Sequence, residues 1–177
     1  IPGITWDVSS TFGDYFDPPE PIHNGPVWHV ATTGSDGNDG SEESPFATIQ
    51  HGIDVSTDGD SVSVSAGNYV ENINYNGKNI AVIGEDWETT IIDGGEVGSV
   101  VTISSSSESA TLEGFTIHNG QSSSGGGVYI DSSTVFLHDM RIENNTSQGQ
   151  GGGVYISSSD IDLNDVTIGS NHAMGDG

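Results

Sequence analysis

Apolar residues return at a nearly constant distance in the second half of the chain. Three columns keep successive spacings of 25 and 26 residues: Leu112, Leu137 and Leu163; Phe115, Met140 and Val166; Ile117, Ile142 and Ile168. The segment GGGVYI also occurs twice, at 125–130 and 151–156. A period of this length with short β segments is typical of a solenoid whose coils bury their inward faces on one another. Equivalent residues would then stack about 4.8 Å apart.

Shorter strand-like segments precede these repeats. SVSVSAG (61–67) alternates valine with serine, and NIAVIG and TTIIDGG follow with β-branched residues and turn glycines. The glycines at 125–127 and 151–153 predict sharp corners with positive φ. Tyr129 and Tyr155 are expected to point outward as a short aromatic ladder.

Asparagines also follow one strand segment in register. Asn119 aligns with Asn144, and Asn145 aligns with Asn171. Asparagine at such bends satisfies backbone groups with its side-chain amide. The alignment therefore predicts structural roles and not ligand binding.

The chain before the coils predicts a short strand around Val27–Ala31, an acidic loop and an amphipathic helix. Ser44 fits the N-cap position and Pro45 the first helical position. The apolar stripe of this helix is Phe46, Ile49 and Ile53. The helix would cap the end of the solenoid.

Residues 1–28 show no period, and their DPPEP cluster blocks regular structure. The segment nevertheless carries Trp6, Phe12, Tyr15, Phe16 and Trp28. Flexible linkers are poor in aromatic residues, so this extended segment is expected to dock, either on its own domain or on a neighbouring subunit. The expected organisation is 1–28 as the extended segment, 29–60 as strand, acidic loop and cap helix, and 61–177 as coils with the last one incomplete.

A leucine-rich repeat is the alternative solenoid. The spacing of Leu137, Met140, Ile142 and Asn145 fits its pattern. Such a repeat continues into further leucines and often a helix, whereas this chain continues through serine and glycine to a second strand. The pattern therefore favours a parallel β-helix with three short strand faces per coil.

Four motifs in a fixed order carry a family resemblance. They are the GSD loop (34–36), PFATIQ (45–50), GDSV (59–62) and GNYVE (67–71). Together with the GGGVYI coils they resemble secreted right-handed parallel β-helix proteins of the pectin-lyase-like superfamily. The resemblance implies an all-β right-handed parallel β-helix with a short capping helix, and an extracellular or cell-surface location. It does not choose a function, because the superfamily includes lyases, hydrolases, epimerases and adhesins.

The excess of acidic over basic residues narrows the classes of partner that the chain is expected to bind. The chain has 26 acidic residues against Lys78 and Arg141, a formal net charge of −24. This balance argues against nucleic acid and anionic membrane surfaces as partners, since both require basic residues. The sequence also lacks an apolar run long enough for a membrane span. So much self-repulsion predicts a setting rich in salt or calcium.

Catalytic residues are not assigned by the sequence. A polysaccharide lyase needs a base and a cation beside the uronate, yet we assign Lys78 and Arg141 structural or solvated roles. A glycoside hydrolase needs two carboxylates; the candidates on adjacent coils are Asp139, Glu143, Asp162 and Asp165. Among 26 acids such pairs arise by chance, and the histidines near repeat edges form no triad: His118, His138 and His172.

A metal is the more specific candidate. The loop GSDGNDGSEES places four carboxylates close together: Asp36, Asp39, Glu42 and Glu43. Carboxylates and free carbonyls suit calcium, although the spacing is not that of an EF-hand, and a solvated turn is the alternative interpretation.

Two functions therefore stand beside each other. The first is a non-catalytic extracellular module of a surface, adhesive or filament-forming protein. The second is the N-terminal part of a secreted carbohydrate-active enzyme, a lyase or hydrolase, with catalytic coils beyond residue 177. Expected partners are an extracellular glycan and further copies of the chain, bound through open β-helix ends or the N-terminal segment.

Overall fold

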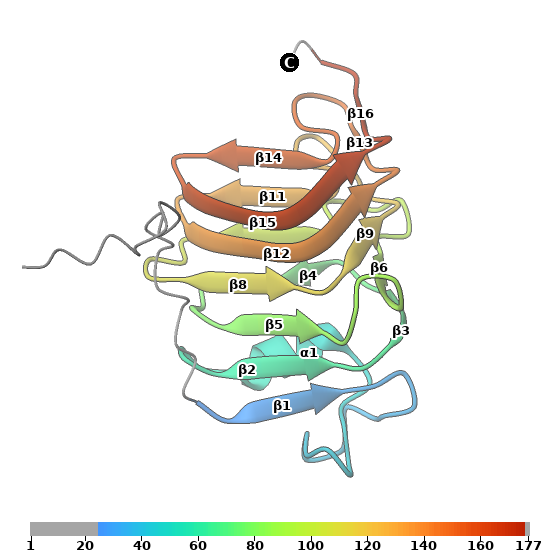
Figure 1. The fold of residues 1–177 in the computed structure, drawn as a ribbon, viewed down its shortest axis with the longest axis vertical. Coiled ribbons are helices and arrows are strands. Elements are labelled where there is room, and N and C mark those ends of the chain that lie inside the picture. Colours follow the sequence, from blue (N-terminus) through green and yellow to red (C-terminus); the bar gives the residue numbers. More distant parts are fainter. Residues whose placement is uncertain (1–24, 176–177) are drawn as a thin grey trace, which may run out of the picture.

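In the computed structural model, which describes residues 25–175, the chain winds into a right-handed parallel β-helix. The chain crosses the front face in Figure 1, turns to the rear at the right and returns across the back while it climbs. The fold class and the resemblance to β-helix proteins are thereby confirmed. Four of the N-terminal aromatic residues, Trp6, Phe12, Tyr15 and Phe16, lie outside the described residues.

Three faces make up each coil. The first face holds β1 (Val27–Val30), β2 (Ser61–Val64), β5 (Ala81–Gly84) and β8 (Ala110–Glu113). The second holds β3 (Gly67–Val70), β6 (Thr90–Asp93) and β9 (Thr116–His118). The long strands β12 (Thr134–Glu143) and β15 (Asp160–Gly169) bend through both faces.

The third face runs back across the solenoid. It holds β4 (Ile73–Asn74), β7 (Val101–Ser104), β11 (Val128–Asp131) and β14 (Val154–Ser157). Short strands lead into it from the second face: β10 (Gln121–Ser122), β13 (Thr146–Ser147) and β16 (His172–Ala173). All strand pairs of the described residues are parallel, with each strand hydrogen-bonded to its equivalent in the next coil.

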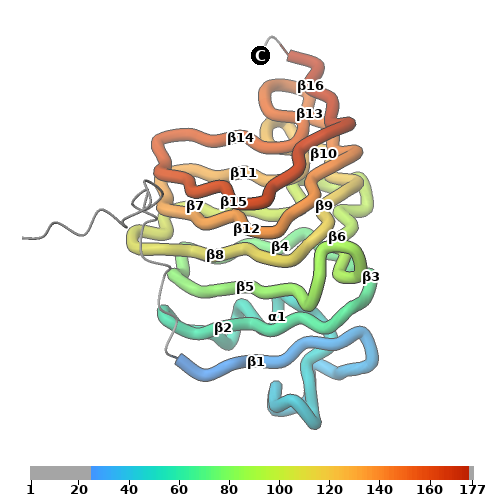
Figure 2. The backbone as a smooth tube through the Cα atoms, in the orientation of Figure 1, coloured from blue at the N-terminus to red at the C-terminus, as the bar shows by residue number. Residues whose placement is uncertain are grey.

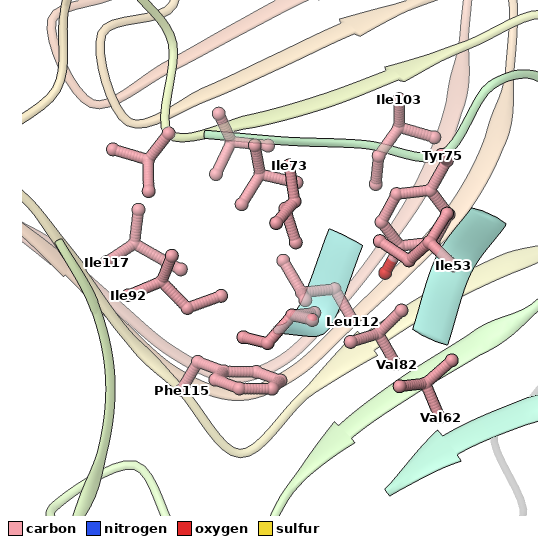
Figure 3. Packing of buried hydrophobic residues seen from close by; sticks show 14 of the residues in the cluster. Ile53, Val62, Ile73, Tyr75, Val82, Ile92, Ile103, Leu112, Phe115 and Ile117 are labelled. Carbon is pink, nitrogen blue, oxygen red and sulfur yellow. The ribbon is translucent and has the colours of Figure 1, made fainter. Parts of the chain in front are cut away.

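The predicted columns form the core. Leu112 pairs with Leu137, and Leu137 with Leu163. Below them the column continues through Val82 and Val62 (Figure 3). Leu112 and Leu137 are fully buried, whereas Leu163 is 52% exposed because it lies on the last described coil. Each buried leucine stabilises the fold by about 1.5–3 kcal/mol.

Glycine corners close each coil, as expected. Gly125 and Gly151 have φ values of 64° and 66°. At Gly120 a Cβ would lie 1.8 Å from the carbonyl oxygen of Gly126 in the same coil, so a side chain there would distort the corner before the third face. Tyr129 and Tyr155 stack with ring centroids 5.3 Å apart, which confirms the aromatic ladder.

A buried asparagine ladder supports the corner before the third face. Asn145 is fully buried, and its Oδ1 accepts from the backbone N–H of Gly120 at 2.8 Å. Its Nδ2 donates to the carbonyl of Ile117 and to Oδ1 of Asn171. Asn144, by contrast, is exposed and adopts a left-handed conformation with φ 55°. The predicted contacts of side-chain amides with backbone groups are confirmed for Asn145 and Asn171, while Asn119 donates to Asp93 instead.

The cap helix starts later than the sequence predicts. α1 spans Ile49–Val55, and Thr48 is its N-cap, with Oγ1 accepting from the N–H of His51. The assignment of Ser44 as N-cap and Pro45 as first helical residue is wrong. Phe46 donates to the carbonyl of His29 and accepts from the N–H of Ala31, and this extended pairing beside β1 excludes Phe46 from a helix that starts at Pro45. The expected apolar stripe is nevertheless buried.

Lys78 closes the other end of α1. Its Nζ donates to the carbonyls of Ile53, Asp54 and Ser56 at 2.7, 2.9 and 2.8 Å. The last carbonyls of a helix have no partner within the helix, so this ammonium satisfies them and complements the helix dipole. The structural role predicted for Lys78 is confirmed. No helix within residues 25–175 is long and apolar enough to cross a membrane.

Substitutions at the adjacent residues Asn145 and Asn144 should differ in their effect on stability. We expect Asn145→Ala to lower the free energy of unfolding by about 3 kcal/mol, because it leaves several buried backbone groups unsatisfied. Asn144→Gly should change stability by less than about 0.5 kcal/mol, because glycine accepts positive φ without strain. Urea denaturation followed by circular dichroism measures both values. Equal losses in the two variants would contradict the ladder.

Candidate functional site

A hollow of about 420 Å³ lies on the outer side of the bend between the first and second faces. Its polar walls come from β12, β15 and the loop between β5 and β6. The hollow is lined by Trp87, Asp139, Met140, Arg141, Asp165, Val166 and Thr167. Its volume is in the range of small-molecule sites.

The bend itself places two carboxylates in the hollow. Asp139 and Asp165 occupy equivalent positions in β12 and β15, and both are left-handed, with φ values of 50° and 52°. Gly114 holds the same conformation one coil below, with φ 75°. Figure 2 shows β12 and β15 passing through this bend one above the other. Aspartate tolerates this conformation, so the turn that bends the solenoid also stacks two acids at the coil spacing.

Trp87 reaches the hollow from a lower coil. Its carbonyl accepts a hydrogen bond from Oγ1 of Thr116 at 2.7 Å. The Arg141 guanidinium carbon lies 5.7 Å from the centre of the Trp87 ring, a cation–π distance. Arg141 Nε also donates to Oε2 of Glu143 at 2.8 Å. Guanidinium and indole thus form one wall, with the arginine charge balanced by Glu143.

An acid–histidine column continues from the hollow along the second face. His118 pairs in register with Asp93, and its Nε2 lies 3.9 Å from Oδ2 of Asp93. Glu143 occupies the next position of the column, since Ile142 pairs with Ile117. Asp93 is oriented by the N–H of Gly95 and by Asn119 Nδ2. These half-buried groups make a polar strip beside Arg141.

The structure brings together only some of the carboxylates considered from the sequence. Asp139 and Asp165 share the hollow, and Glu143 joins it through Arg141. Asp162 lies on the first face instead, where its Oδ1 is 3.4 Å from Nε2 of His138. His172 belongs to β16, away from the hollow. Sequence reasoning missed Trp87, whose only signal was a lone tryptophan in the polar segment GEDWETT.

The acidic loop uses two of its predicted metal ligands in hydrogen bonds. Asp36 Oδ1 accepts from the N–H groups of Ala47 and Thr48, and its Oδ2 accepts from Thr48 Oγ1. Asp39 Oδ1 accepts from the N–H and Oγ of Ser41. These contacts hold the loop against the start of α1.

The other two predicted ligands face elsewhere. Glu42 and Glu43 line a separate groove with His29 and Glu85. Within residues 25–175, no three His, Cys, Asp or Glu side chains are grouped so as to hold a metal ion. Calcium binding by Asp36, Asp39, Glu42 and Glu43 stays a prediction.

Comparisons with known proteins leave the function of this chain open. A family described as a protein of unknown function, DUF1565, matches residues 32–76, the segment that carries most of the resemblance motifs. No curated protein matches the chain. A solved rhamnogalacturonan lyase is similar at 14% identity and a TM-score of 0.41, over 85% of this chain. The chain spans 56% of that structure's length.

Asp36 predicts a pH-dependent contribution to stability. Burial acts to raise its pKa, but the hydrogen bonds from Thr48 and Ala47 outweigh this effect and lower the pKa below its ordinary value. The ionised form therefore stabilises the native state above about pH 4, and this contribution is lost as the pH falls through the native pKa. We expect Asp36→Asn to cost about 0.5 kcal/mol at neutral pH, because the carboxylate is exposed and screened by solvent, and almost nothing at strongly acidic pH.

Denaturation midpoints measured across pH test this prediction. Glu96→Gln is the control, because it removes the same charge from an exposed residue. A stability difference for Asp36→Asn that does not change with pH would refute the assigned role.

Proposed function

We propose that this chain is a non-catalytic β-helix module of an extracellular or cell-surface protein, and that it acts as an adhesive element by binding a glycan in the hollow beside Trp87. The observation that carries the proposal is the hollow itself. It combines a planar indole–guanidinium wall with carboxylates and a threonine hydroxyl. A sugar ring offers a matching combination of an apolar face and a rim of hydroxyl groups.

A binding role accounts for the contacts of the two basic residues. Lys78 donates to three carbonyls at the end of α1, and Arg141 is balanced by Glu143. These contacts favour structural roles for both side chains over catalysis. Asp139 and Asp165 stack on one wall, whereas the carboxylates of a glycosidase flank the scissile bond.

A second candidate function is part of a secreted carbohydrate-active enzyme. It is favoured by the position of the hollow, whose wall includes Asp165 and Thr167 of β15, the last long strand described. Further coils stacked on β15 would lengthen this wall into a groove. The two candidates differ in whether a bound glycan is cleaved.

Trp87 provides the test of the binding site. The chain is tested against a panel of neutral, amino and uronate oligosaccharides, with and without calcium. We expect it to bind no uronate oligosaccharides, because the acidic chain repels them. Trp87→Ala should weaken binding by tenfold or more, equivalent to about 1.4 kcal/mol, while Trp87→Phe retains most of it. Isothermal titration calorimetry measures these affinities.

The control is Phe136→Ala, which removes a half-buried aromatic side chain from the first face, outside the hollow. Unchanged binding in Trp87→Ala would remove the hollow as the site. Release of new reducing ends or unsaturated products from any glycan would replace the adhesive role with the enzymatic one.

A further inference from the structure

The two carboxylates of the hollow have no protein partner. Within residues 25–175, the side-chain carboxylates of Asp139 and Asp165 take part in no hydrogen bond or ion pair. Both side chains are exposed. Because Glu143 balances Arg141, the hollow keeps the two formal negative charges of its stacked aspartates. Its local chemistry therefore suits a ligand that carries a positive charge.

The rest of the molecule reinforces this preference. The chain as a whole carries a formal net charge of −24, and an overall negative field of this kind concentrates cations and repels anionic sugars. A calcium ion is a poor ligand for the hollow, because calcium requires six to eight oxygen ligands. No group of three candidate ligands occurs in the part of the chain that the structure describes.

Resting on the glycan-binding function proposed above, we propose that the ligand is a glycan containing amino sugars with free, protonated amines. The sugar ring packs against the Trp87–Arg141 wall. Its ammonium group donates to the carboxylates of Asp139 and Asp165, which are one coil apart. An ammonium has three N–H donors, so it can serve both acceptors, and such charge-assisted hydrogen bonds are roughly twice as strong as neutral ones.

A basic peptide is the competing cationic ligand, and the architecture favours the sugar. An extended peptide binds most readily by adding a strand to an exposed sheet edge. At the hollow, β12 is already paired on both sides, with β8 and β9 below and β15 above. The Asp139 level therefore offers a wall of side chains and no free strand edge, whereas β15 at the Asp165 level is paired on one side only within residues 25–175. A peptide strand added to β15 would lie beyond the hollow's Asp139 level.

The experiment compares two oligosaccharides of equal length, a glucosamine oligomer and its N-acetylated form, by calorimetry at mildly acidic pH. They share the sugar ring and differ at its nitrogen, which is a charged ammonium in the first and an uncharged, bulkier acetamide in the second. We expect the glucosamine oligomer to bind about tenfold more tightly. The variant Asp139→Asn/Asp165→Asn should abolish this difference. Asparagine tolerates the left-handed conformation, so the bend is retained.

The matched control is Asp160→Asn/Glu96→Gln, which also removes two exposed charges but lies outside the hollow. It should change the affinity for the glucosamine oligomer by less than about twofold. An equal loss in both double variants would show diffuse charge attraction and overturn the proposal.

Three further outcomes separate this inference from the function on which it rests. Equal, Trp87-dependent binding of both oligomers would keep the glycan site and reject the amine preference. Equally tight binding of an oligolysine, with the same dependence on Asp139 and Asp165, would identify a basic peptide as ligand and reject the amino sugar. Absence of binding by every saccharide would reject both proposals.

Discussion

In-register stacking of backbone along the solenoid axis is the interaction on which the structure depends. Each strand satisfies its backbone groups on the equivalent strand of the next coil, so like residues meet like residues. Leu112, Leu137 and Leu163 form one column, while Asn145 and Asn171 form the corner ladder. An insertion within a strand would shift the residues that follow it by one position and turn apolar side chains outward. The corners accept differences in length, because the column spacing is 20 residues from Val62 to Val82, 30 from Val82 to Leu112 and 25 from Leu112 to Leu137.

The same stacking places the side chains of equivalent bend positions directly above one another. The left-handed position between the first and second faces is glycine at residue 114 and aspartate at 139 and 165. Because the bend repeats at the coil spacing, one acid per coil becomes a vertical pair of acids. A local conformational requirement thus creates a negatively charged wall, and the loop that carries Trp87 adds the apolar surface opposite it.

The basic and the acidic side chains of this chain have different roles. The basic side chains Lys78 and Arg141 are both engaged by the protein, the first by helix carbonyls and the second by Glu143 and Trp87. The remaining acids are mostly uncompensated, which opposes compactness and favours cationic ligands. In the hollow, two of these acids lie beside an aromatic wall, and both proposals are based on this combination.

The sequence by itself determined the solenoid. The spacing of residues along the chain predicts its columns, glycine corners and structural asparagines, because each coil repeats the same local contacts. The start of α1 required the tertiary structure, since pairing of Phe46 with β1 overrides the capping signal of Ser44 and Pro45. The hollow required it as well. Trp87 precedes Arg141 by 54 residues, and only the winding of the chain places the loop of one coil beside the bend of another.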